Sequence, residues 1–192
     1  MALLLFIGCF LITSLYAQEE ILQEKAAVLF KDSKSNISNA EKNEIFELTG
    51  FDLLADKSQF HLAENKNGEF PFKAYVYPLD LNNDGIEEIG ITFGNMITSG
   101  NVGSSAFLFI KNEKGHYVRH FGIPGFLAFL PLENNDFPDV IIGGTNLEFP
   151  VWRWNGTEFS MDRKISQTEF NKVNAKFMNE VSKAYTQSLS KE

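Results

Sequence analysis

One stretch of the chain occurs twice, and this internal repeat limits the folds that the sequence can adopt. Residues 78–94, PLDLNNDGIEEIGITFG, resemble residues 131–144, PLENNDFPDVIIGG, at an offset of about 52 residues. Each copy follows a strand-like run and precedes a loop and a further pair of strand-like runs. A unit of this length holds roughly four strands, like one blade of a propeller, whereas a closed propeller needs about four blades or more. The repeat therefore predicts two four-stranded units that do not close into a propeller.

The hydrophobic pattern changes from a helical period to an alternating one at about residue 70. Phe72, Ala74 and Val76 would share one face of a first strand. Further strand-like runs lie at 88–94, 105–111, 116–121, 126–132, 139–144, 150–154 and 157–161. The sequences NEKG and NG, at 112–115 and 155–156, are typical of hairpin turns. We therefore expect about eight antiparallel strands in two blade-like, four-stranded units.

Helices are predicted on both sides of this β region. Residues 18–69 are expected to form a helical N-terminal segment, with one helix from a capping box at Ser38 and Glu41 to Gly50. Within residues 162–192, a second capping box at Ser166 and Glu169 predicts a C-terminal helix packed on the same domain. Its apolar face would hold Phe170, Val173, Phe177, Val181 and Ala184. The fold class is α+β, with residues 70–161 as the repeat-containing β region.

The N-terminus predicts export. Residues 3–16 are an apolar run, and no charged residue precedes Glu19, which is typical of a signal peptide spanning residues 1–17. The run is shorter than the roughly 20 residues of a membrane span, so we expect no span after cleavage and a secreted or periplasmic protein. FIGC, which ends at Cys9, resembles a lipoprotein box, and a lipid anchor on Cys9 is the less favoured alternative.

Net charge limits the classes of partner, and cysteine content limits how the fold can be stabilised. The net charge is −8, which argues against nucleic acid, because phosphate binding needs clustered Lys and Arg. Cys9 is the only cysteine, so the mature chain would have no disulfide. A bound ion is then one alternative way to stabilise an exported domain.

Residues 80–88 carry the strongest chemical signal. Acidic and amide side chains fall at alternate positions, Gly85 permits a sharp turn, and the carbonyl after it can point inward. Such oxygen donors favour a hard ion with high coordination number. The sequence therefore predicts one structural Ca²⁺ site held by Asp80, Asn82, Asp84, the carbonyl of Ile86, and Glu88. An ordinary Asp-Gly turn is the alternative.

The pattern D-x-N-x-D-G-x-x-E followed by a β-branched strand resembles the calcium loop of FG-GAP/VCBS repeats, the integrin-α-like family. It is not an EF-hand, because the position of the bidentate glutamate is occupied by Ile91. The resemblance extends over residues 70–161 at most and is sharp only over 78–94. It implies that the loop joins two strands of a blade and that Asp80, Asn82, Asp84, Ile86 and Glu88 are the ligands.

The second copy of the loop is degenerate. When Asp136 is aligned with Asp84, Leu132 takes the place of Asp80, and the glycine has no counterpart. Pro138 stiffens the turn, and Asp139 stands opposite Glu88. We expect this copy to bind no ion.

Other residues give weaker signals. His116 and His120 would lie on one strand face but about 13 Å apart, too far to share an ion, and His61 has no partner in sequence. The Gly- and Ser-rich residues 93–105 are either a binding loop or a flexible connection.

Trp152 and Trp154 share one face of a predicted strand. They either stack on a glycan or anchor a protein partner, or they pack under the helices. Without a catalytic constellation, the chain is expected to be a non-enzymatic binding module for a protein or glycan. A small extracytoplasmic hydrolase, or an inhibitor of one, is the alternative.

Overall fold

The computed structural model describes residues 2–65, 67–133 and 136–190, and their side chains from residue 16 onward. The helices are α1 (Ala2–Phe30), α2 (Asn39–Thr49), α3 (Met96–Ser99), α4 (Gln167–Phe170) and α5 (Met178–Leu189), with a 3₁₀ turn at Gly100–Val102. The strands are β1 (Phe51–Leu53), β2 (Phe60–Leu62), β3 (Ala74–Leu79), β4 (Glu88–Phe93), β5 (Ser105–Lys111), β6 (Tyr117–Pro124), β7 (Phe126–Phe129), β8 (Val140–Gly143), β9 (Glu148–Trp154), β10 (Phe159–Ser166) and β11 (Lys176–Phe177).

The strands form three antiparallel sheets. The first large sheet has the order β3-β4-β5-β6, and the second has the order β10-β9-β8-β7-β11. The short strands β1 and β2 form a separate two-stranded sheet, and Phe60 of β2 also makes an isolated bridge to Phe72. Within the described residues the sheets are open, and none closes into a barrel or a propeller. The expected α+β class with antiparallel strands between N-terminal helices and a C-terminal helix is therefore confirmed.

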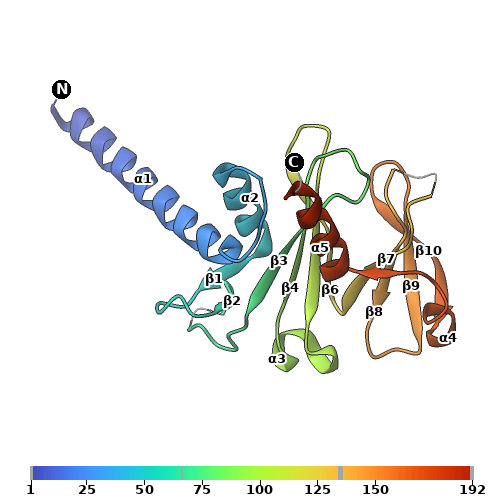
Figure 1. Cartoon of the computed structure of the whole chain (residues 1–192). Coiled ribbons are helices and arrows are strands. Elements are labelled where there is room, and N and C mark those ends of the chain that lie inside the picture. The colour runs from blue at the N-terminus through green and yellow to red at the C-terminus, as the bar shows by residue number, and fades with distance from the viewer. Residues whose placement is uncertain (1, 66, 134–135, 191–192) are drawn as a thin grey trace.

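The elements are arranged in layers (Figure 1). The N-terminal helices and the β1-β2 pair cover one face of the four-stranded sheet, and the five-stranded sheet lies beyond the other face. The helix α5 crosses the four-stranded sheet near β3 and β4. The long helix α1 extends away from the body toward the N-terminus. The loop between β3 and β4 thus lies where the N-terminal layer, the sheet and α5 meet.

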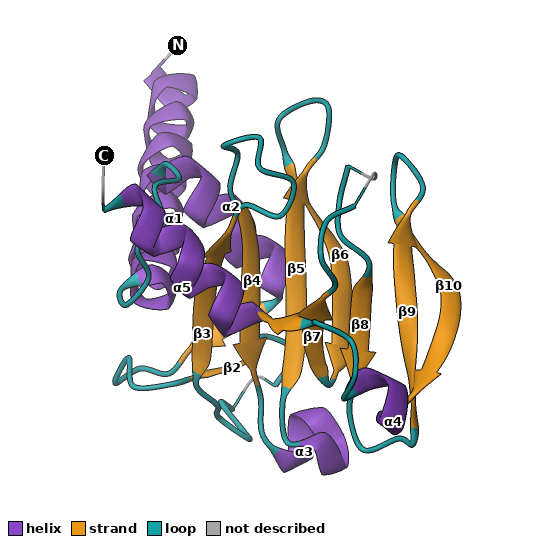
Figure 2. Cartoon of the chain, turned by 45° about the vertical axis from the view of Figure 1, so that its right-hand side comes forward, coloured by secondary structure: helices purple, strands orange, loops and turns teal. Residues whose placement is uncertain are grey.

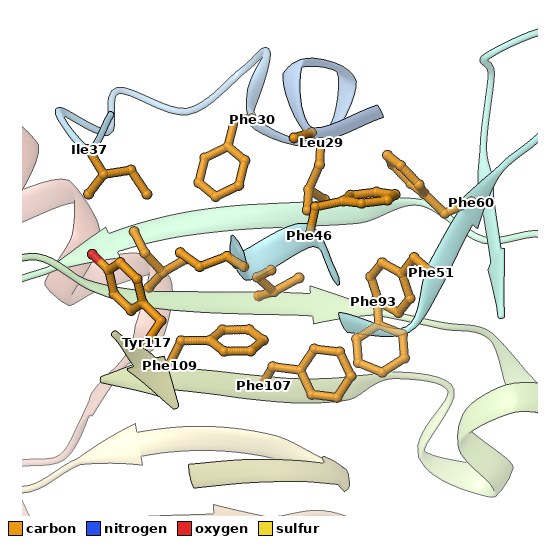
Figure 3. Close-up of a cluster of buried hydrophobic side chains, with 14 of the residues drawn as sticks. Leu29, Phe30, Ile37, Phe46, Phe51, Phe60, Phe93, Phe107, Phe109 and Tyr117 are labelled. Carbon is orange, nitrogen blue, oxygen red and sulfur yellow. The ribbon is translucent and has the colours of Figure 1, made fainter. Parts of the chain in front are cut away.

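An aromatic core joins the N-terminal layer to the sheet (Figure 3). The Phe51 ring packs edge-on against Phe93 with centroids 4.8 Å apart, and Phe93 lies 4.4 Å from Phe107. Leu29 of α1 and Phe46 of α2 approach the same cluster from above the strands. Burying a side chain of this size is worth about 1.5–3 kcal/mol, so this cluster anchors the helices to the sheet.

A second core fills the space between the two large sheets. Leu108 of β5 and Leu127 of β7 are both buried there. Met178, the first residue of α5, enters the same cluster and packs over Gly90 of β4. A Cβ at Gly90 would overlap the Met178 sulfur and lie only 2.9 Å from its Cγ. The glycine therefore allows the start of α5 to approach the sheet closely.

Local signals set the ends of α2. Ser38 accepts a hydrogen bond from the Glu41 N–H, and the Glu41 carboxylate accepts one from the Ser38 N–H, so the expected capping box is present. Gly50 ends the helix with a φ of 69°, a conformation that glycine adopts without strain. This part of the prediction is confirmed.

The segment 18–69 is not helical throughout. Residues Phe51–Leu53 and Phe60–Leu62 form the β1-β2 hairpin instead. The strands were missed because each has only three residues, too few to show an alternating pattern.

The predicted C-terminal helix is interrupted. The capping box at Ser166 and Glu169 is present, but α4 ends at Phe170. Residues 176–177 then pair with β7 before α5 begins. Asn171 and Asn174 are weak helix formers. In addition, the edge of β7 has backbone N–H and C=O groups that would have no partner if the helix were continuous.

The N-terminal prediction falls in α1, which runs without interruption past Ala17 and Gln18. The side chain of Cys9, the alternative lipid site, lies outside the described part. Among the described residues, no helix has both the length and the apolar character needed to cross a membrane.

The edge strand β10 pairs irregularly with its neighbour. Its pairing with β9 shifts between Met161 and Arg163, which leaves Asp162 in a bulge. The residues from Ser160 to Lys164 are exposed and mostly charged. Bulges and charges of this kind protect a sheet margin from further pairing.

Candidate metal centre

The loop between β3 and β4 is tightly closed by its own side chains. The Asp80 carboxylate accepts hydrogen bonds from the N–H of Asp84 at 3.1 Å and of Gly85 at 3.3 Å. Gly85 has a φ of 80°, which a residue with a side chain would adopt only with strain. Asp80 is therefore oriented toward the middle of the loop.

Asp84 is held by two neighbours. Its Oδ1 accepts from the Ile86 N–H at 2.7 Å, and its Oδ2 accepts from the Asn82 Nδ2 at 2.9 Å. These contacts are those of an Asx turn, and they help to order the loop. The Ile86 side chain is half-exposed, and its apolar surface contributes little to the core.

Glu88 is the buried member of the set. Its side chain is 2% exposed, and its Oε2 accepts one hydrogen bond, from the Leu81 N–H at 2.7 Å. Burial, together with the nearby negative charges of Asp84 and Asp80, raises the pKa of Glu88 to about 8. Without a bound cation, the Glu88 carboxyl therefore tends to keep its proton at neutral pH. Among the described residues, none of the ion pairs involves Asp80, Asp84 or Glu88.

The structure brings the five predicted residues into one loop but does not converge their acidic groups on one point. Within the described residues, no three or more His, Cys, Asp or Glu side chains lie close enough together to hold an ion. The predicted set is mixed, since Asn82 would give an amide oxygen and Ile86 a carbonyl. Its oxygen chemistry and its unbalanced charge fit a hard divalent cation.

In the degenerate copy, the acidic residue that corresponds to Glu88 is paired with arginines. Asp139 precedes β8 and accepts two hydrogen bonds from Arg153, at 3.0 Å and 2.8 Å, and one from Arg163 at 3.1 Å. Burial tends to raise the pKa of Asp139, but the two guanidinium groups outweigh burial and lower it. Arginines thus supply the positive charge here. Part of this loop, residues 134–135, lies outside the described residues.

Sequence reasoning missed Glu87. Its carboxylate accepts hydrogen bonds from Ser35 Oγ, from the Asn36 N–H at 2.9 Å and from Tyr185 Oη at 3.2 Å. Tyr117 Oη donates to the Glu87 carbonyl at 2.9 Å. Glu87 therefore ties the N-terminal layer and α5 to the sheet. Its only signal in the sequence is a second acidic residue at the start of a buried strand.

The three histidines are dispersed. His61 is buried, and its Nδ1 lies 2.9 Å from the Leu62 carbonyl oxygen. His116 Nδ1 lies 2.9 Å from the Glu44 carboxylate, while His120 packs 5.3 Å from the Trp154 ring. They do not form a common site.

The two tryptophans belong to the core between the sheets. Trp152 packs edge-on against Phe121 at 5.8 Å, and Trp154 packs 4.8 Å from Phe137. They are partly buried between the two sheets, rather than under the helices as the second interpretation has it.

Residues 93–105 are not a flexible connection throughout. Asn95 caps α3 by accepting from the N–H groups of Ile97 and Thr98, and its Nδ2 donates to the Phe70 and Pro71 carbonyls. Met96 and Ile97 are exposed at the tip of this loop.

Comparison with known proteins adds no relative to this picture: no family model, no curated protein and no solved structure matches the chain. The likeness to the integrin-α-like calcium loop therefore rests on residues 78–94 alone.

Proposed function

We propose that this protein is a calcium-stabilised, non-enzymatic module that binds a protein or glycan outside the cytoplasm. One observation carries the calcium part of the proposal. Among the described residues, the buried Glu88 carboxylate lies beside Asp80 and Asp84 with no cationic partner, whereas Asp139 at the matching place is paired with two arginines.

Calcium would be held by the side chains of Asp80, Asn82, Asp84 and Glu88 and by the Ile86 carbonyl. The ion would offset most of the charge of the three carboxylates, leaving a net charge near −1, and would reinforce the hydrogen bonds that close the loop between β3 and β4. Since Asp80 and Glu88 flank the turn, the ion would fix the register of the first hairpin. Its role in this proposal is structural.

The sheet order supports two blade-like units. Four consecutive strands are neighbours in each large sheet, first β3 to β6 and then β7 to β10. The two acidic loops occupy the same place in both units, between the first and second strand. Repeat proteins commonly use such units to build partner-binding surfaces.

One observation favours the hydrolase alternative. A carboxyl group whose pKa lies near 8 could act as a general acid at neutral pH. However, Glu88 lines neither of the two grooves that border its loop, which Asp80 lines in both cases. A general acid must reach its substrate, so the position of Glu88 supports the binding module.

Export follows from the apolar run at residues 3–16 and is part of the proposal. Cleavage after Ala17 would release a chain with a polar N-terminus at Gln18. Intact-mass analysis of the exported protein tests this cleavage. A chain that starts at Met1, or a lipid on Cys9, would contradict it.

Calcium titration with a thermal melt tests the main proposal. Extracellular calcium modules bind with Kd of about 10⁻⁴–10⁻³ M. At about ten times Kd, binding adds roughly 1.4 kcal/mol, which raises Tm by about 3 °C for a domain of this size. Asp80→Ala should abolish this rise.

The matched control is Asp136→Ala, which removes an exposed aspartate from the degenerate copy and should leave the rise intact. An unchanged Tm in calcium would refute the structural ion. Calcium-dependent turnover of a substrate would favour the hydrolase instead.

A further inference from the structure

The first strand of the four-stranded sheet is an edge strand with an unpaired side. The strand β3 is the last strand on its side of this sheet, and no strand of the described chain pairs with it there (Figure 2). The equivalent margin of β7, the first strand of the second sheet, is covered by β11, whose Lys176 and Phe177 pair with Phe129 and Ala128. Of the two corresponding edge strands, β7 is thus paired with an added antiparallel strand, and β3 is not.

The direction of the free backbone groups of β3 follows from Phe72, two residues before the strand begins. The N–H and C=O of Phe72 both bond to Phe60, at 2.7 Å and 2.9 Å, on the side away from β4. Backbone groups alternate along an antiparallel strand, so those of Ala74 and Val76 point to the same side as those of Phe72. Among the described residues these four groups have no hydrogen-bond partner.

Pro78 ends the open stretch. It occupies the next outward position, where a proline lacks the N–H that an added strand would need. An incoming strand can therefore pair with Ala74 and Val76 in continuation of the Phe60–Phe72 bridge, but not beyond them.

A groove runs along this margin. Its volume is about 330 Å³, and its lining includes residues 73–77 of the strand, the end of α1 and the turn before β2. Three lysines line it, Lys31, Lys57 and Lys73, against one acidic residue, Asp32. Lys57 pairs with Glu24, whereas within the described residues Lys31 and Lys73 have no ion-pair partner. In a chain with a net charge of −8, this is a local cationic site.

Backbone strain lies on the rim of the groove. Lys57 has a φ of 58°, in the left-handed region that residues with side chains rarely adopt. Its N–H bonds to the Leu54 carbonyl at 2.8 Å, and the Leu54 N–H bonds to the Gln59 carbonyl at 3.0 Å, so a closed turn holds this conformation. The turn keeps Lys57 at the groove.

We propose that β3 binds an extended acidic segment of a protein partner, which adds to the four-stranded sheet as an antiparallel strand along Ala74 and Val76. Backbone pairing would supply the alignment, and Lys31 and Lys73 would select acidic side chains. This inference deepens the proposed binding function by naming a protein as the partner, and it does not require calcium.

The probe is a labelled, capped peptide of about six residues in which glutamate alternates with valine, long enough for one strand. Fluorescence anisotropy should show saturable binding to the wild-type protein. The same peptide with alternate backbone nitrogens methylated keeps its charge but loses donors, and it should bind about tenfold more weakly. This arm needs no change in the protein.

Two variants test the two halves of the site. Ala74→Pro removes an outward N–H at a position where a margin strand tolerates proline, and it should weaken binding about tenfold. Lys31→Glu with Lys73→Glu should weaken binding about fivefold. The control Lys164→Glu changes an exposed lysine on β10 and should have an effect below about twofold.

Several results would overturn the proposal. These are no binding to the wild-type protein, equal affinity of the methylated peptide, or complete competition by citrate at the peptide concentration, which would define a small-anion site. The calcium-dependent rise in Tm is measured on the same samples. If that rise persists while the peptide does not bind, the strand site is wrong and the calcium site stands.

Discussion

Glu87 and Glu88 are adjacent and both buried, yet only Glu87 is surrounded by donors from other segments. Its carboxylate receives hydrogen bonds from Ser35, Asn36 and Tyr185, whereas that of Glu88 receives one, from the Leu81 N–H. The two residues are 5% and 2% exposed. Substituting each of them with glutamine therefore gives a matched pair of variants. Glu87→Gln removes a carboxylate that accepts three hydrogen bonds from other segments, and Glu88→Gln removes one that accepts a single hydrogen bond.

Glu88→Gln should stabilise the calcium-free protein at pH 8. Burial raises the folded-state pKa of Glu88 to about 8, far above that of an unfolded glutamate. Between about pH 4.5 and 8 the unfolded chain releases the proton and the folded chain keeps it, so stability falls as pH rises through this window. Glutamine keeps the acceptor for Leu81 and has no charge to bury.

The measurement is denaturant unfolding in chelator from pH 4 to pH 8.5. The wild-type protein should lose on the order of a few kcal/mol across this range, and Glu88→Gln should lose less. The same variant should show no calcium-dependent rise in Tm. A variant that is less stable than wild type at pH 8 in chelator would show that Glu88 is already compensated.

Glu87→Gln should have the opposite effect. A glutamine has one carbonyl oxygen in place of the two carboxylate oxygens, and its NH₂ group would face a hydrogen-bond donor. We therefore expect the free energy of unfolding to fall by about 1–2 kcal/mol. For a domain of this size, Tm should fall by about 5 °C, measured by circular dichroism. Tyr185→Phe removes one donor only and should cost less. The calcium-dependent rise in Tm should persist in both variants, and its loss would place Glu87 in the ion site.

Asp139→Asn should destabilise the protein without changing the number of calcium sites. The arginines lower the pKa of Asp139, so its contribution is present above the unfolded-state pKa of about 4 and is lost as pH falls through the folded value. The cost of the substitution should therefore be about 1–2 kcal/mol at pH 7 and smaller at acid pH. Isothermal titration should still give one calcium per chain. A second site in the wild-type protein that this variant removes would contradict the assignment.

Gly90→Ala should weaken the attachment of α5. The added methyl group would overlap the sulfur of the Met178 side chain, so we expect a loss of about 1–2 kcal/mol. Met178→Ala should be destabilising alone, by about 2–4 kcal/mol, and should relieve part of the cost in the double variant. A double-mutant cycle with unfolding free energies measures this coupling. Additive losses would mean that the two residues do not oppose each other.

Local patterns in the sequence predicted the parts of the fold that local interactions determine. The capping box of Ser38 and Glu41 and the helix end at Gly50 depend on residues within one turn. The repeat at 78–94 and 131–144 predicted antiparallel strands in two four-stranded units. The β1-β2 hairpin and the break after Phe170 were missed, because tertiary packing and the free margin of β7 decide them.

The site residues divide in the same way. The loop from Asp80 to Glu88 is a local pattern, and its turn geometry follows from its sequence. The partners of Glu87 lie 52, 51 and 98 residues away, so no spacing in the sequence could indicate them. The same holds for Asp139, whose arginines lie 14 and 24 residues away and arrive from two other strands.

The bulge at Asp162 in β10 also bears on how the folded protein behaves in concentrated solution. Growth of a fibril from a folded molecule needs a straight, continuous row of unpaired backbone groups onto which the next copy can stack. The shift between Met161 and Arg163 interrupts that row at the outer strand. The bulge therefore disfavours polymerisation of the native protein along β10.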